Sequence, residues 1–252
     1  MKIALIHDDF MQNGGAETLI GEISKIFPSA PIYTSVVNQS KIPKSINTNR
    51  IKVSFMQKLP LINFFYKALL PLYPYAFETF YLLDFDLVVS STTRFAKSII
   101  TQPTTTHICY LNSVPRFLYE KEKKDNYIPK GFTILLKHYF LWLKRWDQAT
   151  AQRVDFFIAN SKNVQTKIKK YYKRDSVIIY PYVDTQFFHP EKTARKGTFY
   201  LIVSRLVKWK QLQIAVEAAN ELSVDLIIVG DGPDKSRLKG IAGKKIRFLE
   251  NI

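Results

Sequence analysis

The stretch Leu201-Ile202-Val203-Ser204-Arg205-Leu206-Val207-Lys208-Trp209-Lys210 decides the fold that this sequence predicts. It begins in an apolar β-type run, Phe199 to Val203, and ends in a basic turn that opens a helix from Gln211 to Leu222. A strand, turn and helix in this order direct backbone N–H groups and the positive end of a helix dipole toward one point. Arg205 and Lys210 add two cations there, which suits a diphosphate. The alternative is an ordinary turn with solvated basic residues, and the spacing alone favours that alternative.

Two glycine-containing turns follow other predicted strands. Gly14-Gly15-Ala16-Glu17 lies between the strand Lys2 to His7 and the helix Ala16 to Ile26, and Gly230-Asp231-Gly232-Pro233 follows the strand Asp225 to Val229. Glycine lets a phosphate or a sugar approach the backbone, and open α/β sheets bind ligands at the carboxyl ends of their strands. Each turn alone also fits a tight turn that needs positive φ. Together, the three corners favour a nucleotide ligand held by two Rossmann-like units.

Strands and helices alternate along the whole sequence, which predicts an α/β protein with doubly wound parallel sheets. Further strands are expected at 32–37, 51–55, 86–90, 107–111, 155–160, 176–180 and 246–249, and a long aromatic-rich helix at 132–153. The polar stretch 187–196 predicts a linker between a first domain, 1–186, and a second, 197–252. The second domain holds about three strands, where a doubly wound unit usually has about five or six. We therefore expect an incomplete, C-terminally truncated second domain.

The composition predicts an anionic partner. The chain has 252 residues and a formal net charge of +16, which fits nucleic acid, an anionic membrane or a phosphorylated small molecule. The sequence carries no RNA-binding signature and no zinc-finger spacing, so we do not expect nucleic acid to be the partner. Cys109 is the one cysteine, which excludes an intramolecular disulfide.

The apolar segment 59–83, LPLINFFYKALLPLYPYAFETFYLL, has to be tested as a membrane span. Three prolines interrupt it and Lys67 and Glu78 lie inside it, whereas a spanning helix needs roughly 20 mostly apolar residues. We therefore expect two short helices around a proline-rich kink, buried as a helical hairpin. The alternative is an apolar surface, flanked by basic residues, that contacts a membrane.

Five motifs follow one another along the chain: Gly14-Gly15-Ala16-Glu17, Ala159-Asn160-Ser161, Tyr180-Pro181-Tyr182-Val183-Asp184, Ser204-Arg205-Leu206-Val207 with Lys210, and Gly230-Asp231-Gly232-Pro233. Their order resembles the family 4 (group 1) retaining glycosyltransferases, which have the GT-B fold of two Rossmann-like domains. Stretches 31–34, 54–60, 86–91 and 107–110 are also similar to the subgroup of mannosyltransferases that use GDP-mannose. The resemblance covers essentially the whole chain.

The resemblance implies a site and a reaction. Arg205 and Lys210 would bind the donor diphosphate, Gly14 and Gly15 would close over the donor phosphate and the acceptor, and the turn with Gly230 and Gly232 would belong to the donor site. It implies no metal and no cofactor, because two cations neutralise the leaving group and the nucleotide sugar, GDP-mannose in the subgroup, is a substrate. The expected reaction moves a hexose, mannose in the subgroup, to a polysaccharide or lipid-linked glycan with retained anomeric configuration.

Two features depart from the family's pattern. In the stretch Tyr110 to Arg116, Asn112 stands where the family has a histidine at the sugar. Asparagine can hydrogen-bond a sugar hydroxyl but cannot carry a proton near neutral pH, so Asn112 is the catalytic candidate with altered chemistry, or else a strand-end turn residue. His107 is expected to be packed. The acidic E-x7-E motif is absent from the sequence, so an inactive binding or scaffold module, or a truncated gene product, stays open as the alternative.

The positive charge also suggests where the chain works. A lipid-linked acceptor would place it in the cytoplasm, at the inner face of the cell membrane, and each basic residue near an anionic leaflet contributes about 1 kcal/mol. The basic residues that would take part are Lys41, Lys44, Arg50, Lys52 and Lys58 beside the apolar segment, and Lys137, Lys144 and Arg145 on the long helix. A merely solvated basic surface is the alternative.

Overall fold

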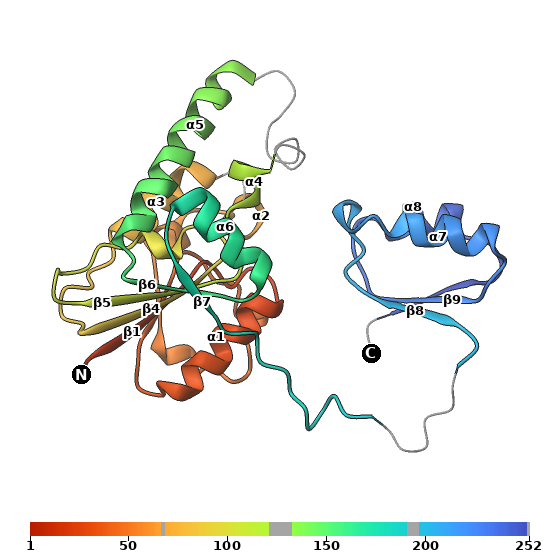
Figure 1. Cartoon of the computed structure of the whole chain (residues 1–252), viewed down its shortest axis with the longest axis horizontal. Coiled ribbons are helices and arrows are strands. Elements are labelled where there is room, and N and C mark those ends of the chain that lie inside the picture. Colours follow the sequence, from red (N-terminus) through yellow and green to blue (C-terminus); the bar gives the residue numbers. More distant parts are fainter. Residues whose placement is uncertain (67–68, 121–132, 191–196, 251–252) are drawn as a thin grey trace. The chain divides into compact units, whose positions relative to one another are not determined.

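The computed structural model describes residues 1–66, 69–120, 133–190 and 197–250, without the side chains of 133–136 and 209. The chain divides into two α/β units, Met1–Val183 and Asp184–Ile252 (Figure 1). This division falls slightly before the linker expected at 187–196. The α/β class predicted from the alternation of strands and helices is confirmed in both units.

The first unit is built on seven parallel strands in the order β3-β2-β1-β4-β5-β6-β7. The strands are β1 Ile3–His7, β2 Ile32–Thr34, β3 Ile51–Val53, β4 Leu87–Thr92, β5 Thr106–Leu111, β6 Phe156–Ala159 and β7 Ser176–Ile178. The sheet grows in one direction from β1 and in the other from β4, so its topological switch point lies between these two strands, where open α/β sheets bind ligands. Strand β2 is shorter than expected, because Ser35 turns to donate its N–H to the carbonyl of Asp8.

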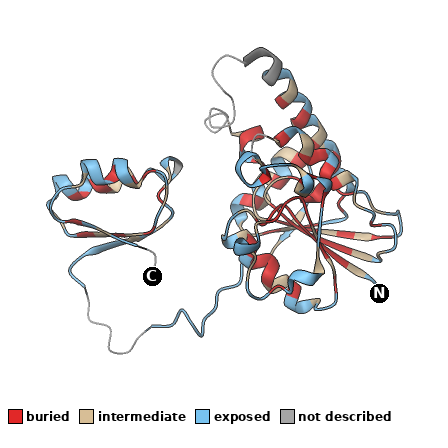
Figure 2. Ribbon diagram, turned by 180° about the vertical axis from the view of Figure 1, so that it is seen from behind, coloured by how far each residue is buried: buried red, intermediate tan, exposed pale blue. Residues whose placement is uncertain are grey.

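Helices cover both faces of this sheet and bury its apolar side chains (Figure 2). Their bounds are α1 Gly15–Ile26, α2 Ile62–Phe65, α3 Tyr73–Glu78, α4 Arg116–Tyr119, α5 Thr133–Thr150 and α6 Lys162–Tyr172. Short 3-10 turns, η1 Gln39–Lys41, η2 Thr48–Arg50, η3 Phe55–Lys58, η4 Leu70–Leu72, η5 Ala96–Ser98 and η7 Ala151–Arg153, connect them. Strand β1 divides the core: Leu5 packs in the same cluster as Ile20 of α1, whereas Ala4 and Ile6 pack in the cluster of α3 and α5.

The apolar segment 59–83 forms two short helices, as predicted, but only one of its faces is buried. Ile62, Tyr73 and Phe77 lie in the core, whereas Phe64 and Phe65 are 81% and 55% exposed. The expectation of a buried hairpin thus holds for one face only, because apolar side chains lie on all sides of these helices and only one side faces the core. Within the described ranges, no helix is both long and apolar enough to cross a membrane.

A fully buried ion pair connects η5 to the long helix α5. Lys97 Nζ donates to Asp147 Oδ1 and, at 3.1 Å, to the carbonyl of Arg94. The hydroxyls of Tyr119 and Tyr172 donate to Asp147 Oδ2 at 2.7 and 2.9 Å. Burial raises the pKa of both tyrosines, so they keep the protons that they donate. The buried carboxylate is thus neutralised by one cation and held by two hydroxyls.

The second unit is a smaller parallel sheet, in the order β10-β9-β8, with helices on one face (Figure 1). Its elements are β8 Tyr200–Val203, η8 Lys208–Lys210, α7 Leu212–Glu221, β9 Leu226–Val229, α8 Lys235–Ile241 and β10 Ile246–Leu249. Val216, Leu226, Ile228 and Leu238 pack between the helices and the sheet. The predicted β-α-β-α-β order is confirmed.

We expect Lys97→Met to lower the free energy of unfolding of the first unit by about 3–5 kcal/mol, because it leaves the Asp147 carboxylate buried without a cation. Urea unfolding measures this loss. Lys169→Met is the matched control, since the pair Lys169–Asp175 is exposed and should contribute less than about 1 kcal/mol. Equal effects of the two substitutions would contradict this role of the buried pair.

Candidate functional site

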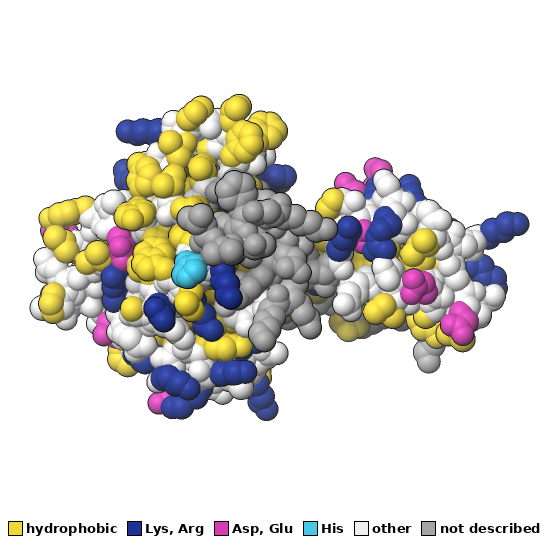
Figure 3. Space-filling view, turned by 90° about the horizontal axis from the view of Figure 1, so that it is seen from above, with side chains coloured by type: hydrophobic (Ala, Val, Ile, Leu, Met, Phe, Trp, Pro, Cys, Tyr) yellow, Lys and Arg dark blue, Asp and Glu magenta, His cyan; other side chains and the backbone are white. Residues whose placement is uncertain are grey.

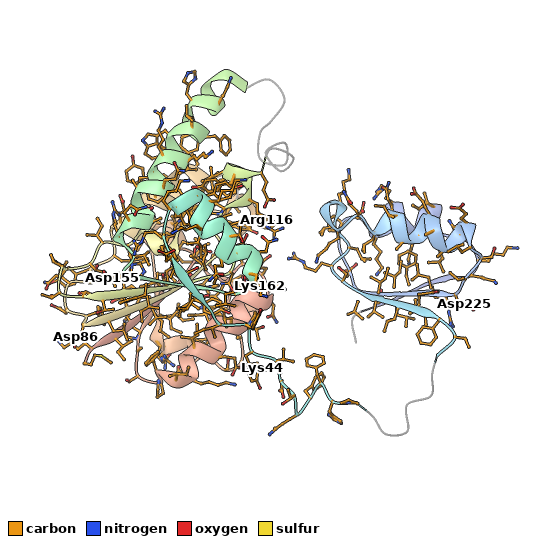
Figure 4. The ribbon with its side chains drawn as sticks, viewed as in Figure 1. Lys44, Asp86, Arg116, Asp155, Lys162 and Asp225 are labelled. Atoms are coloured by element: carbon orange, nitrogen blue, oxygen red, sulfur yellow. The ribbon has the colours of Figure 1, made fainter. Side chains whose placement is uncertain are left out.

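The residues predicted for a site lie at the carboxyl edges of the two sheets, and the two edges are described separately. In the first unit, Arg116 and Lys162 open the helices that follow β5 and β6, and Asp86 and Asp155 precede β4 and β6 at the opposite edge (Figure 4). The carboxyl edge thus holds these two cations together with the carboxylates of Asp8, Asp9 and Glu17, which follow β1.

In the second unit, the turn after β8 is tied to the turn after β9. Leu206 N donates to Asp231 O at 2.9 Å, and Asp234 N donates to Leu206 O at 3.0 Å. The Leu206 side chain is fully buried, so the backbone beside it is fixed while Arg205 and Lys210 are exposed. Gln211 then opens α7 with a φ of 53°, and no side-chain hydrogen bond caps this helix within the described part of the chain. The structure thus brings both predicted cations to one corner near an uncapped helix N-terminus.

Gly230 and Gly232 make this corner possible. Their φ angles are 141° and 155°, a region that favours glycine. A Cβ at Gly230 would lie 2.0 Å from Ser204 O, and one at Gly232 would lie 2.3 Å from Leu206 O. The glycines therefore let the two turns pack backbone against backbone, which a plain turn would not require.

The corner of the first unit is built differently, around buried carboxylates. Asp8 follows β1 and accepts hydrogen bonds of 2.6–3.0 Å from the loop after β4, namely from the N–H groups of Thr93, Arg94, Phe95 and Ala96 and the hydroxyls of Thr92 and Thr93. Asp9 pairs with Arg94, whose guanidinium lies 5.5 Å from the centre of the Tyr73 ring. Burial raises the pKa of both carboxyls. For Asp8, the Arg94 charge and the hydrogen bonds outweigh burial and lower the pKa, whereas for Asp9 it stays raised.

Gly14 and Gly15 open α1 at the same corner, but not in the conformation of a positive-φ turn. Gly14 is extended, with φ −144° and ψ −174°, so the alternative of a tight turn with positive φ does not apply to Gly14. A Cβ on Gly14 would lie 3.0 Å from Glu17 Oε2, whereas the Cβ position of Gly15 has no described atom within 4 Å apart from its chain neighbours and its own helix backbone. Gly14 leaves room for a buried carboxylate, and Gly15 leaves the helix N-terminus open.

Asn112 joins three strand ends. Its N–H continues the ladder to Thr92 O at 2.9 Å, its side-chain Nδ2 donates to Ser91 Oγ at 3.0 Å, and its carbonyl accepts from Asn160 Nδ2 at 2.8 Å. Asn112 is half-buried, which fits both a strand-end role and a contact with a ligand. His107 is packed, as expected: it is fully buried, its Nε2 lies 2.8 Å from Ser90 Oγ, and burial lowers its pKa to about 4.

No sequence motif pointed to His7, Asp8 and Asp9, or to a role for the side chain of Glu17. One signal was available, since polar residues directly after a buried strand, here His7-Asp8-Asp9, often lie at a ligand edge. The partners of His7, Asp8 and Asp9 on β4 and the loop after it, however, lie more than eighty positions away in sequence, so these contacts could not be predicted.

Comparison with known proteins relates the chain to glycosyltransferases. No family model matches the chain. An uncharacterized glycosyltransferase of Methanocaldococcus jannaschii is 25% identical over 270 residues, and the match covers 94% of this chain. The chain spans 64% of the length of that relative.

Two solved structures resemble the whole chain. Anabaena HepE in complex with UDP is 18% identical, with a TM-score of 0.59, and the match covers 100% of this chain and 70% of that one. Sucrose-phosphate synthase of Thermosynechococcus elongatus is 12% identical, with a TM-score of 0.66, and the match covers 100% of this chain and 71% of that one. The class that the fold defines is GT-B, so the predicted fold is confirmed. Membership of family 4 and of the mannosyltransferase subgroup stay predictions.

We expect Gly230→Ala to destabilise the second unit by more than about 2 kcal/mol, because its Cβ would meet Ser204 O at a strained φ. Limited proteolysis and thermal unfolding measure the effect. Gly240→Ala is the control: Gly240 lies in α8 with no described atom within 4 Å of its Cβ position, so alanine should stabilise by roughly 0.5–1 kcal/mol. A tolerated Gly230→Ala would contradict the close packing of the two turns.

Proposed function

We propose that this chain carries the acceptor-side unit and part of the donor-binding unit of a retaining glycosyltransferase that moves a hexose from a nucleotide diphosphate sugar to a glycan. The observation that carries this proposal is the corner of the second unit, where Arg205 and Lys210 are exposed beside the uncapped N-terminus of α7. Two cations and a helix dipole stabilise the charge that develops on a diphosphate leaving group. The GT-B fold and the named relative support the same chemistry.

Two nucleotide sugars are candidates for the donor. The resemblance to GDP-mannose-dependent enzymes supports mannose, whereas HepE was solved with UDP and with UDP-glucose. Both donors share a diphosphate, which is the part that Arg205 and Lys210 would bind. We propose GDP-mannose as the donor, without metal or cofactor, and keep UDP-glucose as the comparison in the binding experiment.

We expect Arg205→Ala to weaken donor binding at least about tenfold, because a charged hydrogen-bond partner of the diphosphate is lost. Calorimetry with GDP-mannose and with UDP-glucose measures the change. Lys244→Ala is the control, since Lys244 is equally exposed but precedes β10 at the other edge of the sheet. An unchanged affinity of Arg205→Ala for both donors would refute the assignment.

Asn112 marks the proposed catalytic position on the first unit, where its amide would contact a sugar hydroxyl. A second candidate function is binding without turnover, because an asparagine already engaged with Ser91 cannot serve as a base. Release of nucleoside diphosphate from a bound donor separates the two functions. We expect Asn112→His to raise that release if the histidine chemistry of the family applies to this site.

The acceptor is proposed to be a lipid-linked glycan or an oligosaccharide, with the chain in the cytoplasm at the inner face of the cell membrane. Supporting this, segment 59–83 exposes apolar side chains, Leu61, Phe64 and Phe65 among them, and Figure 3 shows hydrophobic and basic side chains on one face of the first unit. Lys41, Lys44, Lys52 and Lys58 are exposed, but Arg50 is not available, because its guanidinium donates to the carbonyls of Ala30 and Phe27 at 2.8 and 2.7 Å. The basic surface is therefore narrower than the sequence suggested.

We expect the double substitution Phe64→Ser and Phe65→Ser to reduce sedimentation with anionic vesicles at least about tenfold, because burying each ring contributes roughly 1.5–3 kcal/mol. Phe156→Ser is the control, since Phe156 is 63% exposed but lies on β6, outside the apolar segment. Wild-type sedimentation that does not depend on anionic lipid would contradict the membrane contact.

A further inference from the structure

His7 and Glu17 are buried polar side chains with unused hydrogen-bonding atoms at the switch point of the first unit. Their exposed fractions are 1% and 3%. Among the described residues, neither His7 Nε2 nor Glu17 Oε2 has a hydrogen-bond partner. An unsatisfied buried polar atom is costly, and a pair of them side by side therefore calls for a ligand or a water.

A hydrogen bond and a ring contact fix the orientation of the His7 imidazole. It is the last residue of β1, and its Nδ1 lies 3.1 Å from the carbonyl oxygen of Ser91, its register partner on β4. Because a carbonyl only accepts, Nδ1 carries a proton. The ring also packs 4.9 Å from that of Phe10. Nε2 is the remaining nitrogen, and it lies 3.9 Å from Glu17 Oε1, beyond hydrogen-bond reach.

Glu17 brings a carboxylate to the same point. It lies in the first turn of α1, where the helix dipole favours negative charge. Burial raises its pKa, but the interactions with His7 and a hydrogen bond with Gln12 lower it, so Glu17 is ionised at neutral pH. A Cβ on Gly14 would lie 3.0 Å from Glu17 Oε2, so this glycine lies beside the oxygen.

The neighbouring carboxylates are already occupied. Asp8 is saturated by the loop after β4, and Asp9 pairs with Arg94. They act on His7 through their charge: burial lowers the His7 pKa, but Glu17, Asp8 and Asp9 together raise it above the usual value. His7 Nε2 and Glu17 Oε2 thus lie next to each other, and neither has a hydrogen-bond partner among the described residues.

We propose that His7 Nε2 and Glu17 Oε2 form a subsite for a sugar hydroxyl beside Gly14. A hydroxyl fits because it accepts from an N–H and donates to a carboxylate at the same time. A phosphate does not fit, since Glu17, Asp8 and Asp9 repel it. The choice of a sugar as the ligand rests on the proposed glycosyl transfer. The subsite then assigns Gly14 to a hydroxyl rather than to the donor phosphate.

Nuclear magnetic resonance of the histidine side chains tests this subsite in the full chain. We expect methyl α-D-mannopyranoside or methyl α-D-glucopyranoside to shift the His7 ring nitrogens, and pyrophosphate to leave them unchanged. His107 is the internal reference, because its Nε2 is already bonded to Ser90. Glu17→Gln should weaken the glycoside response at least tenfold, whereas Glu22→Gln, on the same helix and paired with Lys25, should not change it.

Three results would overturn the subsite: His7 resonances that ignore both glycosides, an equal response to pyrophosphate, or a Glu17→Gln chain that responds as the wild type does. If Glu17→Gln fails to fold, the wild-type titration and the variant Gly14→Ala, which crowds Oε2 and should weaken the response, decide in its place. Arg205→Ala separates this inference from the proposed function. This variant should lose donor binding and keep the His7 response. Calorimetry therefore tests the proposed function, and the His7 resonances test the subsite.

Discussion

The buried carboxylate of Asp8 is the constraint on which the first unit's site depends. Burial raises the pKa of an isolated carboxyl, yet here Arg94 and the N–H groups of the β4 loop lower it, so Asp8 stays charged. Because Asp8 follows β1 and its donors follow β4, the two strands that flank the switch point are tied at their carboxyl ends. The contacts of His7 and Asn112 with Ser91 depend on this tie. At the opposite edge, Asp155 accepts from His107 N at 2.7 Å and holds β5 to β6.

In the second unit, the two turns at the carboxyl edge are held together without a buried charge. Backbone hydrogen bonds join the turn of Leu206 to that of Asp231, and glycines at 230 and 232 allow the contact. Arg205 and Lys210 are exposed there beside Asp231, whereas the first unit holds a buried histidine among carboxylates. The two edges therefore suit different chemical groups, a diphosphate in one case and a hydroxyl in the other, which is the division of tasks that the proposed transfer needs.

Much of the fold could be predicted from the sequence because apolar runs and turn residues act locally. The strands, the long helix and the cap of α6, where Ser161 Oγ accepts from Val164 N, follow from such patterns. The failures are non-local. Arg50 was assigned to a basic surface but is bound to carbonyls of another turn. The contacts of Glu17 and Asp8 form only where β1, α1 and β4 meet in the folded chain. Residue spacing along the sequence does not predict these contacts.

The most direct test of glycosyl transfer is to follow the anomeric proton of GDP-mannose and UDP-glucose by nuclear magnetic resonance in the presence of the chain. Transfer to an added glycan or slow transfer to water should release nucleoside diphosphate and give first the sugar with the anomeric configuration of the donor. Donor that binds but is never cleaved would contradict the enzyme and leave a binding module. Release of the inverted sugar would contradict retention.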